Sequence, residues 1–178
     1  MSSGAADIFA NTGGVMEAAL RTACEIVTGR PLPFENLHVQ PIAGLQGVKE
    51  ASVKITGALP EWSFLEGVTV NVAVAHGLGN ARKVIERVRS GAASYHFIEV
   101  MTCPGGCING GGQPLKADLE AVKARMQALY RIDRDEHIRV SHKNTEVQRL
   151  YDEFLGKPLG EMRHRLLHTH YTRREVSV

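Results

Sequence analysis

The sequence predicts an α/β protein whose small, mostly parallel sheet is flanked by helices. Residues 68–75 are β-branched and almost continuously apolar, which is typical of a buried parallel strand. A turn, an amphipathic stretch over 80–89 and a second apolar run over 95–101 follow in order, which predicts a strand–helix–strand unit. The side chains expected to face the sheet from this helix are Ala81, Ile85 and Val88.

Length and composition limit the class of protein. The chain has 178 residues and 43% of them are hydrophobic, enough for the core of one domain or of one lobe of a larger domain. The net charge of +2 does not indicate nucleic acid binding. No run of 18 apolar residues predicts a membrane span, and the N-terminus lacks the pattern of a signal peptide. Three cysteines do not make a disulfide framework, so we expect a reducing, cytoplasmic setting.

The first expected helix spans residues 15–27. Asn11 or Thr12 is expected to cap it, and Gly29 is expected to end it. Cys24 falls on its inward face, so we interpret that thiol as a core side chain rather than a ligand. No strand precedes this helix, which is a first indication that an N-terminal part of the domain is missing.

The remaining elements are predicted from the hydrophobic periodicity and from the glycine and proline residues that interrupt it. They are, in chain order, strands at 38–42 and 51–55, helices at 116–131, 144–155 and 161–171, and a polar loop at 132–143. The side chains expected to face inward from the helix at 116–131 are Leu119, Val122, Met126 and Leu129. We divide the chain into an α/β lobe at 1–143 and a helical tail at 144–178.

Residues 101–114, MTCPGGCINGGGQP, follow the strand at 95–101 and hold two of the three cysteines and five of the eighteen glycines. Cys103 and Cys107 suit two thiolates that hold a metal cluster, with glycines that let the backbone approach it. We expect a loop that enters a helix near Cys107, beyond the carboxyl end of a strand, where open sheets place their sites. The spacing alone leaves a zinc half-site or a pair of buried thiols open.

The whole string at 101–114 resembles, almost residue for residue, the third signature of the iron-only, or di-iron, hydrogenases. Residues 13–22, GGVMEAALRT, resemble the helix beside the active site of that family. Residues 150–171 resemble its C-terminal tail, which is a separate small subunit in some members. The resemblance therefore covers nearly the whole chain, and it implies one lobe of the two-lobed catalytic domain.

The family reversibly combines two protons and two electrons into hydrogen at the H-cluster. This group is a 4Fe–4S cubane joined through one cysteine sulfur to a di-iron unit that carries carbon monoxide, cyanide and a bridging dithiolate. The resemblance implies that Cys103 ligates the cubane and that Cys107 both ligates it and bridges to the di-iron unit. Met101 would pack near the di-iron unit. The pocket around that unit would be formed by Phe9, Gly13, Gly14 and Val15.

The sequence departs from the family pattern upstream. The two other signatures, which supply the remaining two of four cysteines, a proton-relay cysteine and a lysine, are absent. Phe9-Ala10 stands where the family has phenylalanine-glycine, and Asn11 replaces a small residue. The resemblance thus implies the C-terminal part of a hydrogenase, inactive without a missing N-terminal half or subunit. It also implies an electron carrier such as ferredoxin or NAD(P)H, and an apolar docking face through which the free chain could dimerise.

Two other functions remain open. The first is a non-catalytic iron–sulfur sensor or assembly protein built on the same fold. The second is a dinucleotide-binding domain, because Gly77 and Gly79 follow the strand at 68–75 and Glu99 lies 20 residues further on. Arg82 occupies the position of the third glycine of that fingerprint, so an ordinary tight turn is the preferred interpretation.

Glu161, His164 and His168 fall at helical spacing within 161–171. Such a spacing can hold a divalent metal ion. Because the resemblance of the tail already accounts for these residues, we do not expect a metal site there.

Overall fold

The computed structural model describes residues 2–33, 40–41, 47–114, 118–158 and 160–173, with the backbone alone at 40–41. Its internal contacts divide the chain into two compact units, residues 2–141 and residues 142–178, and we describe each separately. Within the described ranges, no helix has both the length and the apolar character needed to cross a membrane.

The larger unit contains one sheet of four strands in the order β1–β2–β3–β4. The strands are Gln40–Pro41, Val48–Lys54, Thr69–His76 and Phe97–Met101. Helix α3, Leu78–Arg89, connects β3 to β4, and these two strands are parallel, so the predicted strand–helix–strand unit is confirmed. Of the strand expected at 38–42, only 40–41 lies within the described residues.

The predicted α/β class is confirmed, but the sheet is mixed rather than mostly parallel. Both β1–β2 and β2–β3 are antiparallel pairs, and β3–β4 is the one parallel pair in the sheet. The apolar character of residues 69–76 arises because helices cover both faces of β3, and burial on two faces says nothing about the direction of the neighbouring strand. No α-helix lies in the 55–68 connection between β2 and β3, which contains only a 3₁₀ helix at Pro60–Leu65.

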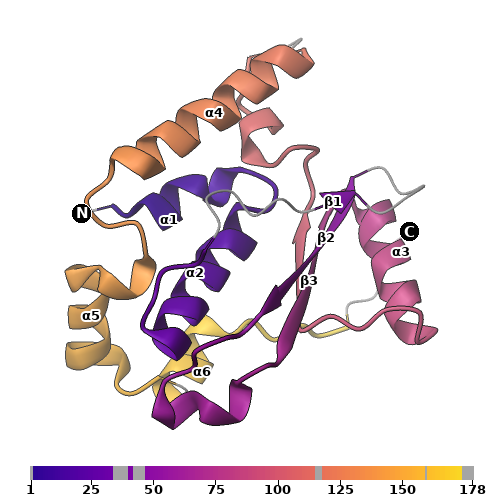
Figure 1. The fold of residues 1–178 in the computed structure, drawn as a ribbon. Coiled ribbons are helices and arrows are strands. Elements are labelled where there is room, and N and C mark those ends of the chain that lie inside the picture. Colours follow the sequence, from indigo (N-terminus) through magenta and orange to yellow (C-terminus); the bar gives the residue numbers. More distant parts are fainter. Residues whose placement is uncertain (1, 34–39, 42–46, 115–117, 159, 174–178) are drawn as a thin grey trace. The chain divides into compact units, whose positions relative to one another are not determined.

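Two small cores lie on opposite faces of the sheet. Alternate residues of β3 point to opposite sides, as the strand period requires. Helix α2, Gly14–Thr28, covers one face, and α3 covers the other (Figure 1). The buried residues of the first core are Met16, Leu20, Val53, Val72 and Val74. Those of the second are Val48, Ala73, Ala75 and Val84.

The helices of the larger unit occur in the predicted order, but some of their ends and buried residues differ from the prediction. Helix α2 matches the expected helix and ends at Gly29, whose φ of 67° lies in the left-handed region. In α3, Ala81 is buried as predicted, but Ile85 and Val88 are exposed and Val84 takes the core position. Only a narrow stripe of α3 reaches the sheet, so the apolar residues beside that stripe face outward.

Helix α4 spans Leu119–Asp135, while the predicted start at Lys116 lies outside the described residues. It extends past the predicted end at 131, and Leu119, expected to face inward, is 69% exposed. The inward prediction fails there because Leu119 occupies the first turn of the helix, after the Asp118 cap. Two short helices that the sequence did not predict lie at Gly4–Asp7 (α1) and Ile8–Ala10.

The smaller unit is helical, as predicted. Helix α5, Thr145–Leu150, continues as a π-helical turn over Tyr151–Leu155 and ends at Gly156. Asn144 caps it, because its Oδ1 accepts hydrogen bonds from the amides of the next turn. Helix α6, Glu161–Leu167, ends four residues before the predicted end at 171.

A buried ionic network ties α2 to the end of α4. The Arg21 guanidinium donates to both carboxylate oxygens of Asp133, at 2.6 and 2.9 Å, and to Glu17. Arg139 donates to Asp133 at 2.8 Å, and the Tyr130 hydroxyl donates to Glu17 at 2.8 Å. Burial opposes ionisation of Asp133, but the hydrogen bonds and charges of the two arginines outweigh it and lower the pKa of the carboxyl. Paired, buried charges therefore link the two helices.

Asp133→Asn should destabilise the larger unit by about 3–5 kcal/mol, because it leaves Arg21 buried without its main partner. The lowered pKa means that the contribution of Asp133 is fully present above the ordinary value of 3.8 and is lost as the pH falls through the folded-state value. Urea denaturation followed by circular dichroism at several pH values measures both effects. Asp135→Asn, at an exposed position of the same helix, should change stability by less than about 0.5 kcal/mol. Equal effects of the two substitutions would contradict the assignment.

Candidate functional site

The two cysteines of the motif lie on a short loop that leaves the end of β4. The Gly106 amide donates to the Cys103 carbonyl at 3.0 Å, which closes a turn between the cysteines. The expected helix near Cys107 is a single 3₁₀ turn at Cys107–Asn109. Both thiols are free; Cys103 is half-buried and Cys107 is exposed. The loop therefore carries two free thiols, neither of them fully buried, on either side of one tight turn.

Two glycines of the loop leave room that a side chain would fill. Gly106 has a φ of +96°, and a Cβ there would lie 2.4 Å from the carbonyl oxygen of Ala10. A Cβ on Gly110 would lie 3.1 Å from the Cys103 sulfur. The first glycine allows another loop to approach closely, and the second leaves space beside a thiol.

The loop that approaches is the N-terminal one, residues 9–14. Asn11 forms an isolated antiparallel bridge with Gly106. The Thr12 amide donates to the Gly105 carbonyl at 3.1 Å. The structure thus brings the predicted pocket segment against the cysteine loop, although the two are more than ninety residues apart in the sequence.

Glu99, in the middle of β4, fastens the same N-terminal loop to the strand. Its two carboxylate oxygens accept hydrogen bonds from the amides of Gly13, at 2.6 Å, and Met16, at 2.7 Å. Burial raises the pKa of this carboxyl, while the two amide hydrogen bonds partly offset that rise. The prediction that Asn11 or Thr12 caps α2 is wrong: the N-cap is Gly13, and the carboxylate arrives from a distant strand.

This role of Glu99 also rules out the dinucleotide-binding alternative. A ribose-binding carboxylate must face the cofactor, but Glu99 is only 5% exposed and both of its oxygens are engaged by α2. The Gly77 amide donates to the Met101 carbonyl at 2.7 Å, so the turn after β3 is held against the end of β4. Sequence reasoning noticed Glu99 only through its spacing and missed its structural role.

The other predicted site residues lie on these same segments. Phe9 is 46% exposed in the 3₁₀ helix that precedes the crossing, and Val15 is half-buried in the first turn of α2. Gly13 has a φ of +95°, and a Cβ on Gly14 would overlap the Ile8 carbonyl group. Met101 is half-buried at the last position of β4. The structure thus places all predicted site residues on two contacting segments, 9–15 and 101–107.

The donor set fits half of a four-thiolate cluster site. Among the residues that the structure describes, no group of three or more His, Cys, Asp or Glu side chains could hold a metal ion by itself. Two free thiols on one short glycine-rich loop, with Gly110 leaving space beside one of them, suit two ligands of an iron–sulfur cluster, which takes four thiolates.

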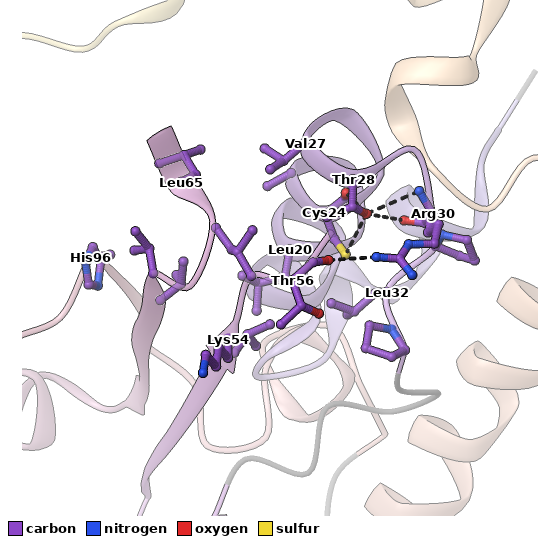
Figure 2. A pocket seen from close by; sticks show the side chains of 17 residues that line it. Leu20, Cys24, Val27, Thr28, Arg30, Leu32, Lys54, Thr56, Leu65 and His96 are labelled. Atoms are coloured by element: carbon purple, nitrogen blue, oxygen red, sulfur yellow. Dashed lines mark hydrogen bonds between the residues drawn. The ribbon is translucent and has the colours of Figure 1, made fainter. Parts of the chain in front are cut away.

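A separate hollow lies at the opposite end of the sheet. It has a volume of about 380 Å³ and lies among the second half of α2, the end of β2 and the start of β3 (Figure 2). Cys24 lines it, with its sulfur 3.8 Å from the Thr28 hydroxyl, and Arg30 closes one side by donating to the Thr56 carbonyl at 2.7 Å. Because β3 runs from this hollow toward the cysteine loop, Cys24 is remote from Cys103 and Cys107, as its interpretation as a structural thiol requires.

Comparison with protein families identifies the two parts of the chain. Residues 1–111 match the family model described as iron only hydrogenase large subunit, C-terminal domain. Residues 119–174 match the model described as iron hydrogenase small subunit, so this second match includes α4 as well as the smaller unit.

The chain is similar in sequence to hydrogenases and to an iron-sulfur assembly protein. It is 47% identical to the NADP-reducing hydrogenase subunit HndD of Solidesulfovibrio fructosivorans, over 98% of this chain and 28% of that protein. It is 42% identical to iron hydrogenase 1 of Clostridium pasteurianum, over 95% of this chain and 28% of that protein. It is also 30% identical to the mouse cytosolic iron-sulfur assembly component 3, over 90% of this chain and 31% of that protein. The chain therefore spans less than a third of the length of these relatives.

Solved structures agree with this similarity. A variant of the FeFe-hydrogenase HydA1 from Chlamydomonas reinhardtii superposes with a TM-score of 0.76 at 42% identity, over 92% of this chain and 45% of that one. A second structure, which concerns oxygen inactivation of an FeFe-hydrogenase through the 2Fe subcluster of its H cluster, gives a TM-score of 0.75 at 43% identity, over 92% and 44%.

Gly106→Ala should separate the two segments of the site. The added Cβ would meet the Ala10 carbonyl at 2.4 Å, and the left-handed backbone is strained for alanine, so we expect a loss of about 1–3 kcal/mol in stability. Gly111→Ala is the matched control in the same loop, because its Cβ would meet nothing within 4 Å and its φ is not left-handed. Thermal unfolding of both variants measures the difference. A Gly106→Ala protein as stable as the control would show that the close crossing is not required.

Proposed function

This chain belongs to the iron-only hydrogenase family, and we propose that it forms the C-terminal part of a catalytic domain that reversibly combines protons and electrons into hydrogen. The observation that supports this proposal best is the crossing of segments 9–15 and 101–107. Every site residue that the motif implies lies on one of these two contacting segments. A turn that served only to connect β4 with α4 would need neither two accessible thiols nor the close approach at Gly106.

The cofactor of the proposed site is an H-cluster, which supplies the redox chemistry and the open iron position for hydrogen when it is bound. Cys103 and Cys107 would provide two of its four thiolate ligands, and Cys107 would hold the di-iron unit as well as the cubane. Met101 would pack beside the di-iron unit. The wall of the pocket consists of Phe9, Gly13, Gly14 and Val15.

The chain's own residues would position the cluster ligands and exclude water from the site. The turn hydrogen bond from the Gly106 amide to the Cys103 carbonyl holds the backbone between the two cysteines in place. Apolar side chains at Phe9, Val15 and Met101 keep the surroundings of the cluster dry, and a dry, shaped shell sets the reduction potential of such groups. Gly110 leaves space beside the Cys103 sulfur. The Glu99 carboxylate holds the pocket loop in place, because both of its oxygens accept amides of that loop and of the first turn of α2.

The remaining ligands come from a polypeptide that supplies the rest of the catalytic domain, either as part of a longer chain or as a separate subunit. The chain's coverage of 28% of its hydrogenase relatives supports this requirement. Exposed apolar side chains such as Phe9, Leu78 and Val100 are candidates for the docking face. Without that partner we expect an inactive protein, which could form a homodimer through the same face. Residues 144–178 form the tail that resembles the small subunit of the family.

The electron carrier is ferredoxin or NAD(P)H, and the protein works in the cytoplasm. The similarity to a subunit of an NADP-reducing hydrogenase supports a nicotinamide-linked route. The second candidate function, an iron–sulfur assembly or sensor protein, has the support of the mouse assembly component, but at 30% identity against 47% for the hydrogenase subunit.

Hydrogenase activity should appear only when the chain is combined with a polypeptide that carries the rest of the domain. After maturation of the combined protein, infrared bands of iron-bound carbon monoxide and cyanide should appear, and reduced viologen should yield hydrogen. The chain reconstituted alone should give neither. Turnover by the chain alone would refute its dependence on a partner, whereas a combined protein with a cubane but no such bands would favour the assembly or sensor role.

Cys107→Ser and Cys103→Ser should each abolish stable cluster incorporation in the combined protein, because each removes one of four thiolates. Iron content and the electron paramagnetic resonance signal of the reduced cubane measure the loss. Cys24→Ser is the matched control, since Cys24 lies beside the hollow at the other end of the sheet, and should retain both. Full iron content in a Cys103→Ser, Cys107→Ser double variant would contradict the ligand assignment.

A further inference from the structure

Asn11 carries a buried polar group that the chain itself does not satisfy. Its side chain is 1% exposed, and neither the nitrogen nor the oxygen of its carboxamide has a hydrogen-bond partner among the described residues. Leaving such a group unpaired is costly, because it loses its hydrogen bonds with water and gains none in the folded chain. A buried polar side chain normally finds a hydrogen-bond partner within the fold, and a site without a partner is normally occupied by an apolar residue.

The location of this unpaired group is specific. The described residues contain five others with an unpaired buried atom. Asp7 and the arginines at 87, 139 and 163 each use another atom of the same side chain in an interaction. The Thr12 hydroxyl is the exception, and it is the neighbour of Asn11. The two described side chains whose polar atoms are all buried and unpaired are therefore consecutive, at the crossing with the cysteine loop.

The backbone of Asn11 lies beside a proposed thiolate ligand. Asn11 pairs directly with Gly106, and Cα atoms of such antiparallel partners lie about 4.5–5.5 Å apart. Cys107 follows Gly106, so its Cα is about 3.8 Å further along the chain. Cys107 is therefore the cysteine adjacent to the residue with which Asn11 pairs, and its sulfur becomes an anionic acceptor when it ligates iron.

We propose that the Asn11 carboxamide donates an N–H···S hydrogen bond to a sulfur of the bound cluster, with the thiolate of the neighbouring Cys107 as the acceptor. This inference rests on the proposed function. A hydrogen bond to a cluster sulfur stabilises the added negative charge of the reduced state, and so raises the reduction potential. Asn11 is in this view a residue that tunes and orients the cluster, and it takes no part in proton transfer.

The inference predicts opposite effects in the cluster-free and cluster-bound protein. Asn11→Leu has nearly the same volume and no polar atoms. In the cluster-free chain it should leave the Tm unchanged or raise it, because it removes an unsatisfied group. In the combined, cluster-containing protein it should shift the midpoint potential of the cubane to a more negative value, measured by a redox titration followed by electron paramagnetic resonance.

Two further variants keep the test decisive. Asn11→Ala also lacks the donor and covers the case in which leucine does not fit. Asn71→Ala, at the far end of β3, loses the hydrogen bond from Ser52 and should leave the potential unchanged. An unchanged potential in both Asn11 variants would overturn the inference, as would a lowered Tm of the cluster-free chain in both. Failure of the unaltered combined protein to take up a cluster would instead overturn the proposed function.

Discussion

The Glu99 carboxylate joins segments that lie 83 and 86 residues apart in the chain, and the geometry of the site depends on it. The residue lies in β4, directly before the cysteine loop, and holds the amides at the start of α2. A helix N-terminus favours negative charge, so the carboxylate both caps the helix and fixes its distance from the strand. Any movement of α2 along its axis would break both hydrogen bonds, and the pocket loop between Phe9 and Val15 would move with it.

Other contacts make this joint rigid. At the crossing itself, Gly106 allows the backbones to approach at a distance that no other residue would permit. One turn further along α2, Arg21 and Glu17 enter the buried ionic network with Asp133 of α4. Because α4 follows the cysteine loop in the chain, α2 is fastened both to the strand before the loop and to the helix after it. The loop that carries Cys103 and Cys107 is thereby held from both sides, while the Cys107 side chain stays exposed.

The sequence predicted the parts of this arrangement that local patterns encode. The period of residues 15–27 and the β-branched run at 68–75 each gave the correct element, and the glycine-rich cysteine motif gave the family. It could not predict contacts between distant segments: the cap supplied by Glu99, the close approach at Gly106 and the pairing of Arg21 with Asp133 have no local pattern. Strand direction was mistaken for a related reason, since apolar composition records burial and not the orientation of neighbours. Ile85 and Val88 were wrongly predicted to face the sheet, because the helical period alone does not say which stripe of α3 contacts it.

Hydrogen exchange at the Thr12 amide tests the central claim most directly. This amide bonds to the Gly105 carbonyl and does not touch Glu99, so it reports whether the two segments stay together. The account predicts that Glu99→Ala releases the protection of Thr12 together with that of Gly13 and Met16. Glu66→Ala, which removes a carboxylate that accepts two amides in a remote loop, should leave all three protected. A Thr12 amide that stays protected in Glu99→Ala would contradict the account, because the crossing would then hold without the carboxylate.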